Sequence, residues 1–162
     1  MAEELLFTKD ATRETVYQEI IPQIKGVMMD EPDLVANLAN ISAILKEAFD
    51  FFWVGFYRWD GKELVLGPFQ GPLACTRITL EQGVCGAAAR TQQTQLVPDV
   101  EEFPGHIACN SASKSEIVVP LLTNGGCELV LDVDSDQLDD FSSLDQSYLE
   151  KIVDLIREQH YS

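Results

Sequence analysis

Apolar side chains recur every three to four positions in two stretches near the start of the chain, residues 12–29 and 33–50. This spacing is typical of amphipathic helices that bury one face. Pro22 lies inside the first stretch and is expected to bend or break that helix, because proline lacks the amide that a helix interior uses. Asp33 follows Pro32 and is expected to cap the second helix.

After residue 50 the pattern changes to short apolar runs that are separated by turn residues. Such runs predict strands, and the turn residues predict hairpins at 59–62 and 123–126. The predicted strands span 51–57, 63–69, 77–80, 95–97, 116–122 and 127–134. A short helix rich in Ala and Gly is expected over 83–90, between the third and fourth strands.

Helical spacing returns at the end of the chain, where residues 141–158 predict a helix with capping residues at its start. The resulting order implies an α+β fold, a mostly antiparallel sheet with helices packed on one face. We expect a single domain over residues 1–162, with a helical N-terminal segment at 12–50, the sheet and the site at 51–135, and the C-terminal helix.

Length and charge restrict the class of partner. The 162 residues, 46% of them hydrophobic, suffice for one hydrophobic core. A formal charge of −16 argues against nucleic acid and anionic membranes as partners, since both attract basic surfaces. No apolar run is long enough to cross a membrane, and acids stand where an export signal carries bases. With four cysteines in all, the chain is expected to be cytoplasmic with its thiols reduced.

Three of the four cysteines lie in segments rich in Gly, Ala and Pro, and these segments point to the chemistry. They are Cys75, Cys85 and Cys109. Small neighbours let a ligand approach the backbone closely, and clustered thiols can attack a substrate and then close a disulfide. Cys127 lies beside a predicted turn and is expected to be structural.

Six short motifs follow one another along the predicted sheet region. They are Trp53-Val54-Gly55-Phe56-Tyr57, Gly67-Pro68-Phe69-Gln70-Gly71-Pro72-Leu73-Ala74-Cys75, Gly83-Val84-Cys85-Gly86, Gly105-His106-Ile107-Ala108-Cys109, Ser115-Glu116-Ile117-Val118-Val119-Pro120 and Leu131-Asp132-Val133-Asp134-Ser135. In this order and spacing they resemble the free methionine-(R)-sulfoxide reductases, GAF-fold enzymes that reduce the free amino-acid sulfoxide. The chain departs from the family pattern at Asn110, where the family has an acid, and around Leu129, where it tends to have glycine.

The resemblance implies a reaction carried out by thiols and a carboxyl group. Cys109 would attack the sulfoxide sulfur as a thiolate, and Glu116 would donate a proton to the departing oxygen. Cys75 would then capture the sulfenic acid as a disulfide, with Cys85 as the alternative resolving residue or a structural one. A thioredoxin-like protein would reduce that disulfide, so no bound cofactor and no metal are expected.

Two further acids are expected to bind the substrate beside Glu116. Asp132 and Asp134 share one face of a strand, because side chains alternate along it. Three converging carboxyl groups repel one another, so at least one should keep a proton near neutral pH. That proton could be delivered to the sulfoxide oxygen, while the remaining carboxylates could hold the substrate ammonium group.

The remaining substrate contacts are expected from two aromatic residues and a loop. Trp53 and Tyr57 are four positions apart on a strand and therefore project to the same side, where their rings would cradle the S-methyl group. Ile107 and Ala108 belong to the loop 105–113, whose amides could hold the substrate carboxylate.

Other interpretations use some of the same residues. A non-catalytic GAF sensor would bind a small molecule or respond to redox state without turnover, and a thiol peroxidase-like or disulfide-exchange protein would use the same cysteines. His106 could join the three clustered cysteines in a zinc site, but their spacing differs from that of paired C-x-x-C motifs. A homodimer fits the resemblance, since GAF domains often pair through their helices.

Overall fold

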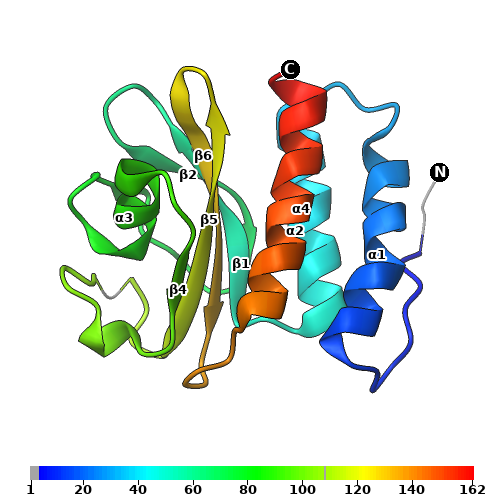
Figure 1. Ribbon diagram of the computed structural model, residues 1–162, viewed down its shortest axis with the longest axis horizontal. Helices are drawn as coiled ribbons and strands as arrows, with labels where there is room; N and C mark the ends of the chain where they lie inside the picture. The colour runs from blue at the N-terminus through cyan, green and yellow to red at the C-terminus, as the bar shows by residue number, and fades with distance from the viewer. Residues whose placement is uncertain (1–3, 108) are drawn as a thin grey trace.

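The computed structural model describes residues 4–107 and 109–162. Its centre is a six-stranded sheet with helices on both faces (Figure 1). Every neighbouring pair of strands is antiparallel, in the order β3-β2-β1-β6-β5-β4. The predicted α+β class and antiparallel sheet are therefore confirmed.

The strands lie close to their predicted positions. They are β1 (Trp53–Trp59), β2 (Leu64–Gln70), β3 (Arg77–Ile78), β4 (Gln95–Val97), β5 (Ser115–Thr123) and β6 (Gly126–Ser135). A single turn of 3-10 helix, Val100–Glu102, follows β4. β6 occupies the middle of the sheet between β1 and β5, which brings the predicted acids of the two neighbouring strands β5 and β6 together.

Three long helices cover one face of the sheet. They are α1 (Arg13–Met28), α2 (Leu34–Phe49) and α4 (Ser143–His160). In Figure 1, α2 and α4 lie against the sheet and α1 lies outside them. Asp33 caps α2 by accepting a hydrogen bond from the amide of Ala36, as predicted. Among the described residues, none of these helices combines the length and apolar character that a membrane crossing requires.

The expected break at Pro22 was wrong. The helix α1 runs through Pro22 to Met28. Ile20 and Ile24, on either side of the proline, are fully buried in the core beneath the long helices. Burial of these side chains offsets the one backbone hydrogen bond that the proline removes.

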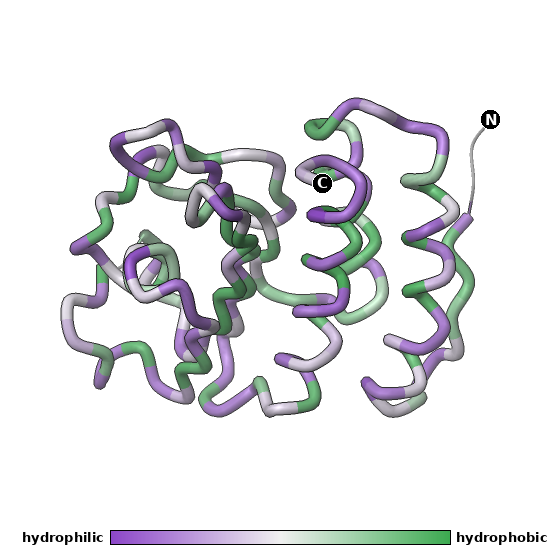
Figure 2. Tube along the Cα trace, turned by 45° about the horizontal axis from the view of Figure 1, so that its top comes forward, coloured by the Kyte–Doolittle hydropathy of each residue, from purple (hydrophilic) through white to green (hydrophobic). Residues whose placement is uncertain are grey.

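The short helix α3 (Gly83–Thr91) lies on the opposite face, so the expectation of helices on one face holds only for the long ones (Figure 1). Ala88 and other small residues let α3 pack closely on the sheet. Because both faces of the sheet are covered, β1, β5 and β6 are buried along most of their length. The long helices alternate between hydrophilic and hydrophobic residues (Figure 2). The site lies on the α3 side.

Candidate active site

A cavity of about 50 Å³ lies between the sheet, α3 and two loops. Its walls include almost every predicted site residue that the structure describes. These are Trp53, Tyr57, Cys85, Ile107, Cys109, Glu116, Asp132 and Asp134. Ala108 lies outside the described residues. The remaining predicted residue, Cys75, is joined to the cavity wall through its bond to Cys109.

A disulfide links Cys75 to Cys109, with 5.4 Å between their Cα atoms. Each cysteine lies in a loop beside the cavity, and the bond ties the two loops together. Cys109 is exposed and Cys75 half-buried, so a reductant can approach the bond from solvent. Gly71 starts the first loop with φ +139°, and a Cβ there would lie 2.7 Å from the Trp53 ring. Glycine is therefore required where the chain turns toward Cys75.

The two aromatic residues of β1 hold the Cys75 loop in place. The Tyr57 hydroxyl donates to the Cys75 carbonyl at 2.8 Å, and the Trp53 indole N–H donates to the Pro72 carbonyl at 3.1 Å. The rings stack with centroids 5.9 Å apart. Sequence reasoning placed both rings in the pocket but missed this tethering role, because the motif shows which residues are present and not where their polar atoms point.

Three acids converge on the cavity from the paired strands β5 and β6. Glu116 lies opposite Asp134, and Asp132 lies opposite Val118 in the same register. Glu116 and Asp132 are buried, with exposed fractions of 8% and 5%, and Asp134 is half-buried. One oxygen of Asp132 is buried without a hydrogen-bond partner. No Lys or Arg lies among the described residues that line the cavity.

The physical consequence is that at least one of these carboxyl groups retains a proton. Burial raises the pKa of Glu116 well above its usual value, and the charge of Asp132 raises it further. Burial likewise raises the pKa values of Asp132 and Asp134, with added repulsion from Asp134 and Glu116 respectively. A proton is therefore available inside the cavity near neutral pH, as the converging acids predicted.

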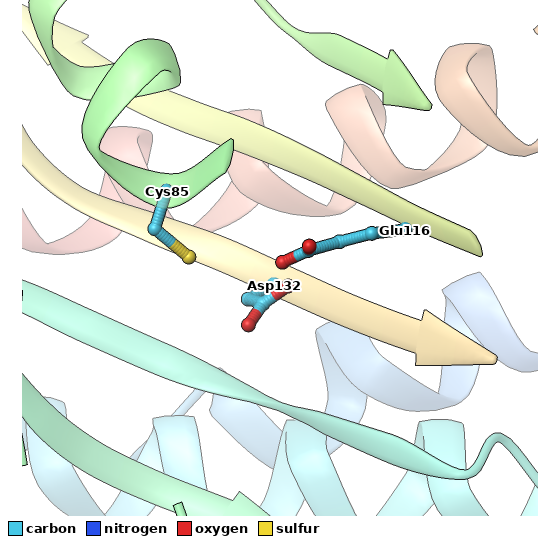
Figure 3. Close-up of side chains that lie close together, drawn as sticks. All are labelled: Cys85, Glu116 and Asp132. Atoms are coloured by element: carbon cyan, nitrogen blue, oxygen red, sulfur yellow. The ribbon is translucent and has the colours of Figure 1, made fainter. Parts of the chain in front are cut away.

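Cys85 points from the first turn of α3 toward Glu116 and Asp132 (Figure 3). Its thiol is free and buried. Burial and the Asp132 charge raise its pKa well above the usual value, so Cys85 stays a neutral thiol despite its place near a helix N-terminus. The role of alternative resolving residue stays a prediction.

Cys127 lies at the far end of β6, outside the cavity. Its thiol donates to the carbonyl of Leu129, and burial raises its pKa to about 11. A thiol with so high a pKa is a poor nucleophile at neutral pH, which agrees with the structural role expected for it.

Metal-ligating atoms come together at one place in the described part of the chain. Cys85, Glu116 and Asp132 each offer one atom, and these atoms lie within 4.8 Å of one another (Figure 3). Cys75 and Cys109 are bonded to each other and offer no thiolate in this state. This set of ligand atoms therefore differs from the zinc site considered in the sequence analysis, which consisted of His106 and the three clustered cysteines.

The loop that carries Cys109 is stabilised by hydrogen bonds that the sequence analysis did not predict. Asn110 accepts a hydrogen bond from the amide of Ala112 at 2.8 Å, which closes a turn directly after Cys109. The amide of Gly83 donates to the Gly105 carbonyl at 2.9 Å and joins the loop to α3. Asn side chains often accept a hydrogen bond from the amide two residues further along. Asn110 itself is therefore the signal that could have identified this turn.

The comparisons with known proteins agree with this geometry. Residues 29–158 match the model of the GAF domain family. "GAF domain-containing protein A" of Dictyostelium discoideum is 55% identical over 157 residues, covering 96% of this chain and 99% of that protein. The free methionine-R-sulfoxide reductase of Escherichia coli is 44% identical over 138 residues, covering 85% of this chain and 84% of that protein.

A solved structure extends the likeness to the whole fold. The free methionine-R-sulfoxide reductase of Neisseria meningitidis, in complex with its substrate, has a TM-score of 0.93 and 51% identity to this chain. The match covers 96% of this chain and 94% of that one. With matches of this extent in both sequence and structure, the chain belongs to the free methionine-R-sulfoxide reductases of the GAF domain family.

Proposed function

We propose that this protein is an oxidoreductase that reduces free L-methionine-(R)-sulfoxide to L-methionine. The observation that carries the proposal is the meeting of the Cys75–Cys109 bond with three carboxyl groups, two of them buried, around one cavity. The likeness to reductases of this substrate supports the same reaction. The cytoplasm, which keeps thiols reduced, is the expected compartment.

The proposed reaction transfers the sulfoxide oxygen to Cys109. The Cys109 thiolate attacks the sulfoxide sulfur while a carboxyl group protonates the oxygen, which leaves a sulfur–sulfur bond and a hydroxyl group on the substrate sulfur. The hydroxyl group then moves to the Cys109 sulfur as the sulfur–sulfur bond breaks, and methionine is released. Cys109 is left as a sulfenic acid. The Cys75 thiol then attacks the Cys109 sulfur, and the oxygen leaves as water while the disulfide forms. The substrate gains two electrons, and the two thiols lose them.

Glu116 is the proposed proton donor. It is buried, and its raised pKa keeps it protonated until the oxygen develops charge. Asp132 and Asp134 are proposed to hold the substrate ammonium group. The Trp53 and Tyr57 rings, on the strand β1 that pairs with β6, would contact the S-methyl group.

The small size of the cavity supports a proposal about how the substrate enters and leaves. A volume of about 50 Å³ is far below the roughly 300 Å³ of a small-molecule pocket. Methionine sulfoxide therefore needs a wider cavity than the disulfide-bonded form provides. We propose that reduction of the disulfide frees the two loops to admit the substrate, and that its formation expels methionine.

The function is tested by offering the reduced protein each isomer of methionine sulfoxide, free and within a peptide, with dithiothreitol as reductant. The proposal expects methionine only from the free R isomer. Saturable binding of that isomer without methionine release would instead identify a sensor.

We propose a thioredoxin-like protein as the physiological reductant, with Leu73 as part of its docking surface. Leu73 lies two positions before Cys75 and is 89% exposed, although a large apolar side chain gains free energy by burial. A protein that reduces the disulfide must contact this loop. Such a partner would cover Leu73 while its thiolate reaches the bond.

Leu73→Ser is expected to lower thioredoxin-coupled kcat/KM about tenfold, by removing one buried apolar contact at the interface. Turnover with dithiothreitol should fall much less, because a small reductant needs no docking surface even though Leu73 also borders the cavity. Leu138→Ser is the matched control, since Leu138 is also exposed but lies on another loop. An equal loss with both reductants would show that Leu73 acts on the substrate instead.

Cys75→Ser is expected to separate reduction from recycling. The variant should still release one equivalent of methionine in a single turnover, because Cys109 remains, but should lose thioredoxin-coupled cycling. Cys85→Ser should keep that cycling. If Cys85→Ser lost it and Cys75→Ser did not, the two assignments would be reversed. The single-domain organisation of residues 1–162 and a homodimer through the long helices also stay predictions.

A further inference from the structure

The cluster of Cys85, Glu116 and Asp132 combines a thiol with two carboxyl groups, each from a different element. Cys85 comes from α3, Glu116 from β5 and Asp132 from β6, and their side chains point toward one another (Figure 3). One ligand atom from each lies within 4.8 Å of the others, and all three residues are buried. The arrangement is held by the fold, because the strands are paired and α3 packs on them.

The cluster also contains an unsatisfied polar atom. Asp132 is 5% exposed, and its Oδ1 has no hydrogen-bond partner. Buried polar atoms nearly always have a partner, so this oxygen marks a place where a donor or a cation fits. The described lining of the cavity offers no Lys or Arg, so the partner must be a proton on Cys85 or Glu116, or a cation bound in place of those protons.

We propose that Cys85, Glu116 and Asp132 bind a divalent cation of the Zn²⁺ type, and that this ion inhibits the reductase by occupying its acid cluster. The inhibitory part rests on the proposed function, whereas the binding part does not. The ion would bind in place of the protons on these groups, which leave to solvent.

The donor set selects the kind of ion. Zn²⁺ accepts thiolate and carboxylate ligands together, whereas Mg²⁺ and Ca²⁺ prefer oxygen alone. Ligand atoms around tetrahedral Zn²⁺ lie roughly 3.5 Å apart, so rotation of the Glu116 and Asp132 side chains would close the remaining distance. The cavity of about 50 Å³ has room for an ion with one water as the fourth ligand.

Binding is tested on the oxidised protein, in which Cys75 and Cys109 are bonded and the free thiols are Cys85 and Cys127. Co²⁺ serves as the probe, because thiolate coordination gives a charge-transfer band in the near ultraviolet. The band should appear in the wild type, disappear on addition of Zn²⁺, and persist in the matched control Cys127→Ser.

Two substitutions decide which residues bind the ion. Cys85→Ser should abolish the band, and the isosteric Asp132→Asn should weaken Co²⁺ affinity more than about tenfold. Absence of the band in the wild type, or its loss in Cys127→Ser, would overturn the site. These measurements need no turnover, so they stand whether or not the protein reduces methionine sulfoxide.

Inhibition is tested separately, in single turnovers of pre-reduced protein with and without excess Zn²⁺. Zn²⁺ should slow methionine release more than about tenfold in the wild type, and this ratio should approach one in Cys85→Ser. An equal ratio in both proteins would place the inhibitory ion on the other thiols and overturn the inhibitory role.

Discussion

Cys109→Ser is expected to lower the rate of methionine formation by at least about a thousandfold, the loss typical when a nucleophile is removed. A serine hydroxyl is not ionised near neutral pH, and it cannot form the sulfenic acid or the disulfide. Cys109 borders the cavity beside the acids, whereas burial raises the pKa of Cys85, the other thiol in the described cavity lining, and keeps it a weaker nucleophile. The measurement is methionine release from the free R isomer with dithiothreitol.

The matched control for this variant is Cys127→Ser, which removes a thiol outside the cavity and should leave the rate unchanged. If Cys109→Ser kept a rate within tenfold of the wild type, another residue would be the nucleophile. Cys85 would then be the first alternative, because its sulfur also faces the cavity.

Glu116→Gln is expected to lower kcat by about a hundredfold to ten-thousandfold, the range typical of general acid catalysis. The amide has nearly the same shape but cannot deliver a proton to the sulfoxide oxygen. Glu101→Gln is the matched control, because Glu101 is an exposed acid on the 3-10 helix outside the cavity lining. A rate unchanged in Glu116→Gln would transfer the role to Asp132 or Asp134.

The same substitution should change the pH profile of methionine formation. Burial raises the pKa of Glu116, so the wild-type acid keeps its proton well above the pH at which an exposed glutamate loses it. Activity that depends on this proton is present below the raised pKa and falls as the pH rises through it. Glu116→Gln should therefore lose this alkaline limb together with the rate.

Several features of the fold follow from the sequence because they depend on local rules. Alternation along β6 placed Asp132 and Asp134 on one face, and the structure confirms that both reach the cavity. The cap at Asp33 and the hairpins also depend on neighbouring residues alone. Pro22 shows the limit of such rules, because distant core contacts keep the helix continuous there.

Other features required knowledge of which segments meet in space. The pairing of Cys75 with Cys109 spans 34 positions and was implied by the resemblance to a known family, not by spacing. The position of α3 on the opposite face follows from its packing on the sheet, which periodicity does not encode. The tethering of the Cys75 loop by Tyr57 depends on a single hydroxyl direction, for which the sequence carries no signal.

The central claim is that Cys109 takes the oxygen and Cys75 closes on it, beside the acids of β5 and β6. The most direct measurement mixes fully reduced protein with one equivalent of free methionine-(R)-sulfoxide, and then quantifies methionine while peptide mapping locates the disulfide. The account predicts equal amounts of methionine and of the Cys75–Cys109 bond, and neither product from the S isomer. Methionine without that bond, or with a bond to Cys85 in its place, would contradict it.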